Sequence, residues 1–400
     1  MVQVPIPYGR QSIDQADIDA VTEAVSAPLV TQGPLVDQFE KALAAASGTQ
    51  HAVVASSGTA ALHMLYSALG IGPGDEVIVP ANTFAATAAA AVLCGARPII
   101  ADVDTNSGNL EPPQLESALS RANNAKLVVA VHFAGRPCDL DGLSAVCNSA
   151  GVELVEDACH ALGARDQHGN PIGSHPGSRA AVFSFHPVKS ITSAEGGAVV
   201  TDDAVIADRT RRLRHHGITR ADDPSQVHAT SAPWHYEIEQ LGFNYRLSDI
   251  HCALGLSQLN KLGDFVATRE RLARRYDELL AQRCPAVAPL GAAPWTTARS
   301  AWHLYVIRIL GDNATERRRQ AYEYMHSSGV AVQVHYPPLH HHPFYQALSD
   351  TRIEDVPGAE DYYSRCLSLP LFPDLTADQQ DTVIDALAEV CCSQDETTRT

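Results

Sequence analysis

Short apolar runs alternate with helical patterns over the first two-thirds of the chain. The first run starts at residue 51 and ends in Ser-Ser-Gly-Thr, and later runs of buried-strand type occupy 75–80, 98–103, 126–132, 152–157, 181–185 and 197–201. Helical spacing precedes the first run, at 14–25 and 35–46, and lies between later runs, at 59–69 and 85–93. This alternation predicts a mostly parallel α/β sheet covered on both faces, with ligands at the carboxyl ends of the strands.

The pattern changes after the last of these runs. Helical spacing continues over 240–262, a long polar helix is predicted over 264–282, and strands are predicted at 301–309 and 330–334. We therefore expect a large domain over 12–262 and a smaller C-terminal α+β domain over 263–392 that includes residues 1–11. The polar tail, 393–400, is predicted to be disordered.

Lys189 lies in a polar loop between the runs 181–185 and 197–201. A lysine between buried strands has a lowered pKa, which makes its amine a nucleophile or a Schiff-base former. The alternative from this stretch alone is an ordinary surface lysine in a long loop.

Two further strand ends carry candidate chemistry. The junction at 57–59 leads from a strand into a helix, where backbone amides can hold a phosphate, although an ordinary capped turn has the same pattern. Asp157 ends another strand and could cap a helix over 158–162, or it could keep the pyridine nitrogen of pyridoxal phosphate protonated. His160 would share its face of that helical turn, unless it is a core histidine.

Charge and composition exclude several classes of protein. The net charge of −17 argues against nucleic-acid and anionic-membrane binding, and no apolar run is long enough to cross a membrane. The nine cysteines lack a Cys-x-x-Cys pair, which favours reduced thiols and a cytoplasmic protein.

Four histidines cluster near the C-terminal third of the chain, namely His335, His340, His341 and His342. Three consecutive side chains do not converge on one ion in a helix or strand, and no cysteine or carboxylate accompanies them at ligand spacing. We therefore expect no metal site.

Together these motifs resemble the DegT/StrS-type nucleotide-sugar aminotransferases over nearly the whole chain. The resemblance rests on Ser-Gly-Thr at 57–59, Glu-Asp-Ala-Cys-His at 156–160, Phe-Ser-Phe-His-Pro-Val-Lys at 183–189, Glu-Gly-Gly at 195–197 and Gly-Phe-Asn-Tyr-Arg at 242–246. Further stretches, at 7–11, 31–34, 131–135, 234–237, 249–250 and 335–338, are most similar to the 4-aminotransferases of pseudaminic acid biosynthesis.

The resemblance implies an aspartate aminotransferase-like fold, of fold type I, with a mostly parallel seven-stranded sheet in the large domain. It implies that pyridoxal phosphate binds Lys189 as a Schiff base and that the enzyme is a homodimer with shared active sites. The implied cofactor contacts are Gly58, Thr59 and Ser184 at the phosphate, Asp157 at the ring nitrogen, Phe84 against the ring, His160 near the phenolic oxygen, and Asn244 from the neighbouring subunit. The implied substrate contacts are Tyr8, Arg10, Gln32, His335 and Tyr336.

The implied reaction transfers an amino group from L-glutamate to the C4 keto group of a UDP-linked 2-acetamido-2,6-dideoxy-hexos-4-ulose. Retention of Lys189 favours amination over the sugar dehydration of a family offshoot that has histidine there. Departures at 190–194 and 251–252 leave open another keto sugar or a cyclitol as the substrate. A non-catalytic regulatory protein that keeps the fold is the other alternative.

Overall fold

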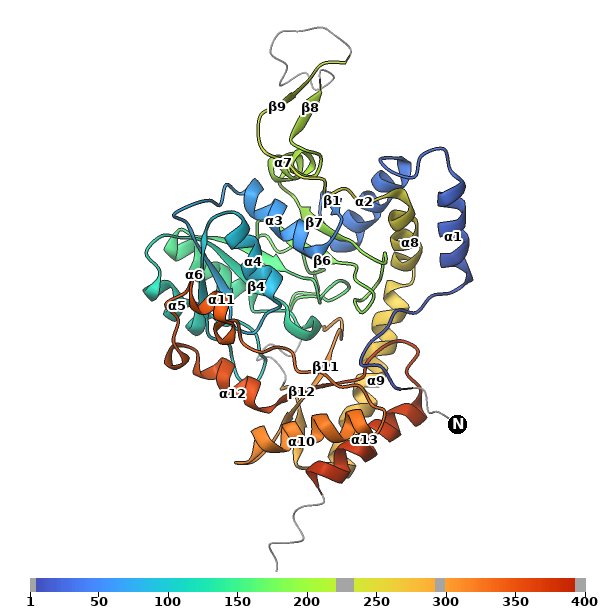
Figure 1. The fold of residues 1–400 in the computed structure, drawn as a ribbon, viewed down its shortest axis with the longest axis vertical. Coiled ribbons are helices and arrows are strands. Elements are labelled where there is room, and N and C mark those ends of the chain that lie inside the picture. Colours follow the sequence, from blue (N-terminus) through green and yellow to red (C-terminus); the bar gives the residue numbers. More distant parts are fainter. Residues whose placement is uncertain (1–4, 221–233, 292–298, 393–400) are drawn as a thin grey trace, which may run out of the picture.

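The computed structural model describes residues 5–220, 234–291 and 299–392. Its centre is a seven-stranded sheet in the order β1-β7-β6-β5-β4-β2-β3, in which only β7 runs antiparallel to its neighbours (Figure 1). The strands are β1 (His51–Ala55), β2 (Glu76–Pro80), β3 (Arg97–Ala101), β4 (Ala125–Val131), β5 (Glu153–Asp157), β6 (Ala181–Ser184) and β7 (Gly197–Thr201). The predicted α/β fold with a mostly parallel sheet is confirmed.

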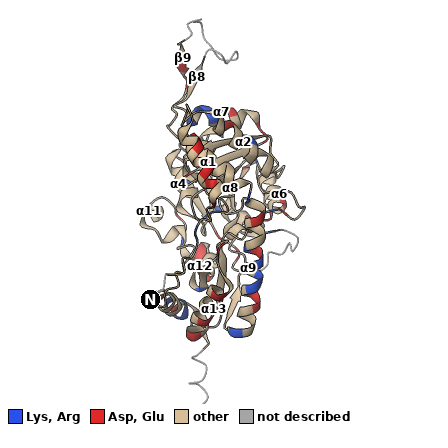
Figure 2. Cartoon of the chain, turned by 90° about the vertical axis from the view of Figure 1, so that its right-hand side faces the viewer, with Lys and Arg blue, Asp and Glu red and all other residues tan. Residues whose placement is uncertain are grey.

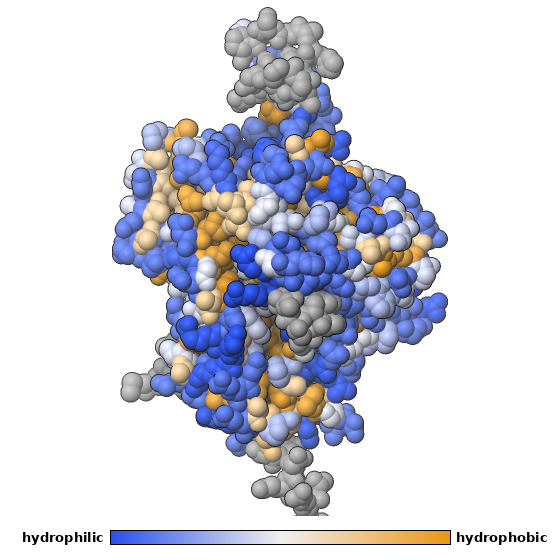
Figure 3. Space-filling view, turned by 180° about the vertical axis from the view of Figure 1, so that it is seen from behind, coloured by the Kyte–Doolittle hydropathy of each residue, from blue (hydrophilic) through white to orange (hydrophobic). Residues whose placement is uncertain are grey.

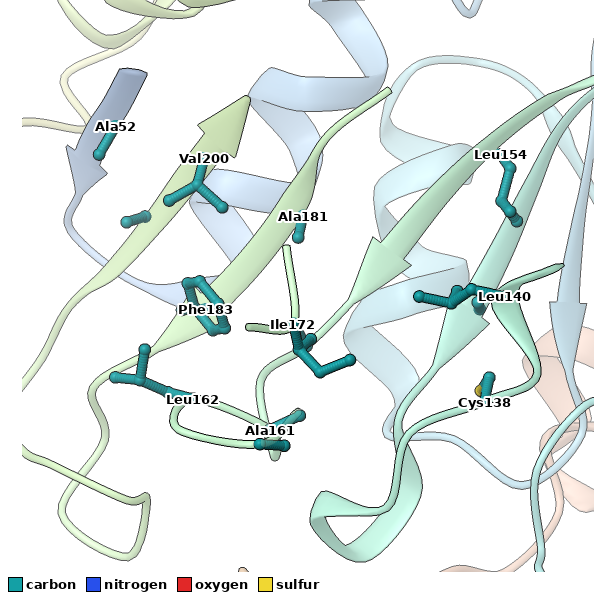
Figure 4. Close-up of a cluster of buried hydrophobic side chains, with 14 of the residues drawn as sticks. Ala52, Cys138, Leu140, Leu154, Ala161, Leu162, Ile172, Ala181, Phe183 and Val200 are labelled. Atoms are coloured by element: carbon teal, nitrogen blue, oxygen red, sulfur yellow. The ribbon is translucent and has the colours of Figure 1, made fainter. Parts of the chain in front are cut away.

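Alternate residues of the strands pack into two separate cores, because successive side chains point to opposite faces of a sheet. On one face Ile78, Val128 and Phe183 pack against helices α2 (Pro34–Ser47), α5 (Pro112–Arg121), α6 (Leu140–Ala150) and α8 (Asp249–Leu259). On the other face Val79 and Val129 pack against helices α3 (Gly58–Ala68), α4 (Ala85–Leu93) and α7 (Ala204–Arg214). Figure 4 shows part of the first core, with Phe183, Ile172 and Leu162 filling the space beside the strands.

The C-terminal part is a smaller α+β unit with its own core. An antiparallel sheet of β10 (Val287–Pro289), β11 (Tyr305–Ile309) and β12 (Cys366–Leu369) packs with helices α9 (Leu262–Arg283), α10 (Ala314–Ser327), α12 (Pro357–Arg365) and α13 (Ala377–Cys391). Charged residues recur along α9 (Figure 2), whereas its Leu272, Tyr276 and Leu279 are buried. A short helix, α11 (Pro343–Gln346), precedes α12.

The N-terminal segment lies against this smaller unit. The Ile6 amide donates to the Gly329 carbonyl at 2.8 Å, and the Ala331 amide donates to the Ile6 carbonyl at 2.9 Å. The strand predicted at 330–334 is wrong, because the structure has only isolated bridges there, Ile6–Val330 and Gln333–Ser368. Helix α1 (Gln15–Ser26) then leads back to the large sheet, and the division into domains at 262/263 stays a prediction.

A narrow hairpin of β8 (Ile218–Arg220) and β9 (Tyr236–Ile238) projects from the body beyond α7 (Figure 1). The helical pattern predicted over 240–262 holds only from α8 onward, where Ser248 caps the helix by accepting from the His251 amide. Among the described residues, no helix is both long and apolar enough to cross a membrane. The tail predicted to be disordered, 393–400, lies outside the described residues.

Candidate active site

A cavity of about 330 Å³ opens where β1, β2, β5 and β6 end. Ten predicted site residues line it: Tyr8, Gly58, Thr59, Phe84, Asp157, His160, Ser184, Lys189, His335 and Tyr336. These residues come from separate strand ends and from the C-terminal unit. The sheet order brings them together, because the parallel strands all end at one edge.

One end of the cavity is built for a small anion. The Ser57 hydroxyl accepts from the Ala60 amide at 3.1 Å and so caps helix α3, whose first residue is Gly58. A Cβ at Gly58 would lie 3.0 Å from the Ser184 Cβ, so glycine leaves room between the helix start and β6. The free amides and the positive end of α3 suit a phosphate group.

Asp157 is buried at the end of β5, with 6% of its surface exposed. Its Oδ2 accepts from the Thr87 hydroxyl at 2.7 Å and its Oδ1 accepts from the Cys159 amide at 3.2 Å. No helix follows, because the chain turns immediately and the Ala161 amide donates to the Ala158 carbonyl. The alternative of a helix cap over 158–162 is therefore wrong, and the carboxylate faces the cavity instead.

Lys189 lies on the loop between β6 and β7, where its half-buried side chain lines the cavity. Burial lowers the pKa of its amine, while the nearby Cys159 and Asp157 act in the opposite direction. The buried Arg269 of α9 donates to the Lys189 carbonyl at 3.3 Å and so fixes the loop. The alternative of a solvated surface lysine does not fit this environment.

A group of rings closes the side of the cavity beside Lys189. His160 Nε2 lies 3.2 Å from the Tyr336 hydroxyl, and the His160 ring lies 4.2 Å from the ring of His303. Burial lowers the pKa of both histidines well below the usual 6.5. Among the described residues, the buried Nδ1 atoms of both rings lack a hydrogen-bond partner.

Sequence reasoning missed His303. Its loop reaches the cavity through backbone pairing with the turn after β4, where the His303 amide donates to the Ala134 carbonyl at 3.1 Å. A Cβ at Gly135 would lie 3.0 Å or less from backbone atoms of His160 and His303, so glycine permits this approach. The only signal in the sequence was the Phe-Ala-Gly stretch at 133–135, which does not identify its partner.

One wall of the cavity, formed by Tyr8, Phe84, His335 and Tyr336, is aromatic and uncharged, while the exposed Glu195 lines another part. The rings of Tyr8 and His335 lie 5.8 Å apart, and burial lowers the pKa of His335 to about 4, so it is neutral near pH 7. Phe84 lies 6.1 Å from Tyr336 at the cavity mouth and is 60% exposed. Such a wall suits a neutral, partly apolar ligand.

Three predicted residues lie outside this cavity. Arg10 pairs with Asp374 at 3.3 Å. Gln32 lines a separate cavity of about 650 Å³ together with Arg246. Asn244 pairs with His215 in an isolated bridge close to that second cavity.

The first cavity fits pyridoxal phosphate by its chemistry. The α3 amides match the phosphate, the hydrogen-bonded Asp157 matches the ring nitrogen, and the buried Lys189 amine matches the aldehyde. The absence of a side chain at Gly58 leaves space between the start of α3 and Ser184. The groups that match the phosphate, the ring nitrogen and the aldehyde therefore all line one cavity.

Comparisons with known proteins agree with this geometry. Spore coat polysaccharide biosynthesis protein SpsC of Bacillus subtilis (strain 168) is 38% identical over 386 residues, which is 96% of this chain and 97% of that protein. The structure of Helicobacter pylori PseC, an aminotransferase involved in pseudoaminic acid biosynthesis, is 31% identical with a TM-score of 0.88, covering 97% of this chain and 100% of that chain.

A third relative is a sugar aminotransferase of Streptococcus pneumoniae, Spr1654, whose solved forms include a PLP form and a PMP form. Its PMP form is 29% identical with a TM-score of 0.88, covering 96% of this chain and 99% of that chain. The DegT/DnrJ/EryC1/StrS aminotransferase family matches residues 11–388. The chain therefore belongs to the DegT/DnrJ/EryC1/StrS aminotransferase family, as its motifs predict.

Proposed function

We propose that this protein is a pyridoxal-phosphate-dependent sugar aminotransferase. In this proposal it transfers an amino group from L-glutamate to the C4 keto group of a UDP-linked 2-acetamido-2,6-dideoxy-hexos-4-ulose. The observation that carries the proposal is the cavity at the strand ends, where Lys189, whose pKa is lowered by burial, lies near Asp157. The PLP and PMP forms of Spr1654 support the cofactor, and the involvement of PseC in pseudoaminic acid biosynthesis supports the substrate class.

Several residues of the cavity would have defined roles in such a transfer. Pyridoxal phosphate, when bound, supplies an electron sink for the carbon that loses its proton. The start of α3 and Ser184 hold the phosphate, and Asp157 holds the proton on the ring nitrogen. Because burial lowers its pKa, the Lys189 amine loses its proton more readily than a solvated lysine and can act first as base, then as acid.

The aromatic wall is suited to the sugar. Tyr8, Tyr336 and the neutral His335 offer hydrogen-bonding groups without a net charge. Sugar hydroxyl, acetamido and keto groups are neutral and match such partners. The amino donor's carboxylate has no assigned partner in this proposal.

We infer that the active enzyme is a homodimer in which Asn244 reaches the partner's cofactor. Large apolar side chains are strongly exposed near the β8–β9 hairpin and Asn244, with Trp234 at 81% and Leu241 at 79%. Figure 3 shows further apolar patches between hydrophilic areas of the surface. Apolar side chains that are exposed in one chain would be buried in a dimer interface. Such a dimer would bring Gln32 and Arg246 toward the partner's substrate.

SpsC gives a specific reason to test a second substrate class. It is more similar in sequence than PseC, at 38% against 31% identity, and its name refers to a spore coat polysaccharide. The alternative is therefore amination of another keto sugar by the same residues. A non-catalytic role fits less well, because Lys189, Asp157 and the phosphate site all share one cavity.

The substrate proposal is tested with purified enzyme, pyridoxal phosphate and glutamate. A panel of UDP- and TDP-linked 4-keto sugars and a keto cyclitol is offered, and amino products are identified by mass. We expect product from the UDP-linked 2-acetamido sugar, and none from the Lys189→Ala control. Turnover of TDP sugars or the cyclitol alone would overturn the substrate assignment while leaving the aminotransferase assignment intact.

A further inference from the structure

Two consecutive histidines and a distant carboxylate converge outside the active site. His340 and His341 lie on the short helix η2 (Leu339–His341), and the Nε2 atom of each is 2.6 Å from Oε1 of Glu360 on α12. The potential ligand atoms of the three residues all lie within 4.8 Å of one another. His340 is buried, whereas the side chains of His341 and Glu360 are 32% and 28% exposed.

The sequence argued against a metal site because neighbouring histidines diverge in a helix or strand and no carboxylate lies at ligand spacing. The structure contradicts both points. In the tight turn of η2 the two rings lie at 75° to each other with centroids 4.7 Å apart, so both reach one point. The carboxylate comes from 20 residues farther along the chain, beyond any local ligand spacing. His342, the third histidine of the run, is exposed and stays outside the cluster.

We propose that His340, His341 and Glu360 bind a divalent zinc-type cation, with both imidazole Nε2 atoms and the carboxylate as ligands. Two histidines and one carboxylate are a common ligand set for Zn²⁺, whereas Mg²⁺ and Ca²⁺ prefer all-oxygen sites. Zinc–nitrogen bonds are about 2.0–2.1 Å long. The bound cation would take the place of the Nε2 protons through which the two imidazoles now donate hydrogen bonds to the carboxylate. The solvent-exposed side leaves room for a water ligand.

The cation would serve as a structural link behind the active site. Helix η2 directly follows the wall residues His335 and Tyr336, and the Leu339 amide donates to the Ala81 carbonyl at 3.0 Å. Helix α12 is anchored separately, because its Gly358 and Ala359 amides donate to Asp102. A cation shared by η2 and α12 would join these two anchored segments.

Metal binding is measured on the full chain loaded with pyridoxal phosphate, after treatment with a chelator and dialysis. We expect one Zn²⁺ per chain with a Kd of about 1 µM or tighter, and visible d–d bands with Co²⁺ at wavelengths beyond the cofactor's absorbance. His341→Ala and Glu360→Gln should each weaken binding at least tenfold. Saturating Zn²⁺ should raise the melting temperature of the wild type but not of these variants.

His342→Ala is the matched control, because it also removes one histidine from the run but none from the cluster. It should bind Zn²⁺ as the wild type does, and Lys189→Ala should too, which separates this site from the cofactor site. Equal loss of binding in His341→Ala and His342→Ala would indicate adventitious binding and overturn the proposal. Wild-type protein without stoichiometric Zn²⁺ or Co²⁺ binding would overturn it as well.

Discussion

At the residue scale, the environment of Lys189 links stability to chemistry. The unfolded chain exposes this amine, whose usual pKa is 10.5, while burial in the folded protein lowers its pKa. Between the folded and unfolded pKa values, the unfolded state therefore binds more protons. Linkage then makes the stability of the apoprotein rise with pH across this window, and the charged amine destabilises the fold below it.

Replacing Lys189 by methionine removes this charge at nearly unchanged volume. We expect the Lys189→Met apoprotein to be more stable than the wild type at pH 7, with a difference that shrinks as the pH approaches 10. Urea unfolding at pH 7, 8 and 9.5 measures the difference. A difference that stays constant across these pH values would show that the buried amine does not titrate as described.

A second residue-scale prediction concerns the support of Asp157. The Thr87 hydroxyl donates its proton to Asp157 at 2.7 Å and therefore accepts from the Thr83 hydroxyl at 2.7 Å. Thr87→Val removes both hydrogen bonds, and loss of the one to Asp157, about 1–1.5 kcal/mol, should lower turnover roughly tenfold. Thr382→Val, at a half-buried position on α13 far from the cavity, is the control. Turnover of Thr87→Val equal to that of the control would contradict a supporting role.

Residues at strand ends could be predicted, whereas residues on irregular loops could not. Lys189, Asp157 and the Ser-Gly-Thr turn each adjoin an apolar run that marks the end of a strand. Glu360 adjoins no such run, and His303 lies before the start of β11 instead of at a strand end. Both reach their places through contacts between distant segments. The spacing of residues along the sequence does not predict those contacts.

At the element scale, the phosphate site depends on how closely β7 approaches the start of α3. Gly197, the first residue of β7, pairs with Ala55 and with Ser184 in the sheet. A Cβ at Gly197 would lie 2.6 Å from backbone atoms of Ser57 and Gly58. Backbone cannot yield as a flexible side chain does, so glycine is required here.

We therefore expect Gly197→Ala to destabilise the protein by about 2 kcal/mol or more and to weaken cofactor binding strongly. Gly72→Ala is the control, because a Cβ there meets nothing within 4 Å. Denaturant unfolding and cofactor titration of both variants provide the measurement. Tight cofactor binding by a stable Gly197→Ala protein would contradict this account of the loop.

Elements with strong periodicity were predicted well. The predicted strands and helices of the large sheet lie within a few residues of β1–β7 and α1–α4. The errors fall where a short apolar stretch is held by tertiary contacts. The 330–334 stretch pairs only through single bridges, and the 158–162 stretch turns toward the cavity instead of forming a helix.

At the scale of the whole molecule, the shared active site makes a prediction about mixed dimers. A hybrid of one Lys189→Ala chain and one Asn244→Ala chain contains one intact site if Asn244 acts on the partner's cofactor. At limiting cofactor the purified hybrid should have about half the wild-type activity, whereas both parental dimers should be far less active. If Asn244 acted within its own chain, the hybrid would not exceed the mean of the parents.

The most direct test of the central claim is the absorbance of the cofactor-loaded protein before and after glutamate. Attachment of pyridoxal phosphate to Lys189 predicts a visible band in the wild type that glutamate bleaches and that Lys189→Ala lacks. Adding the accepted keto sugar should then restore the band. A wild-type band that glutamate leaves unchanged would contradict the account of glutamate as donor, and an identical band in Lys189→Ala would contradict the role of Lys189 itself.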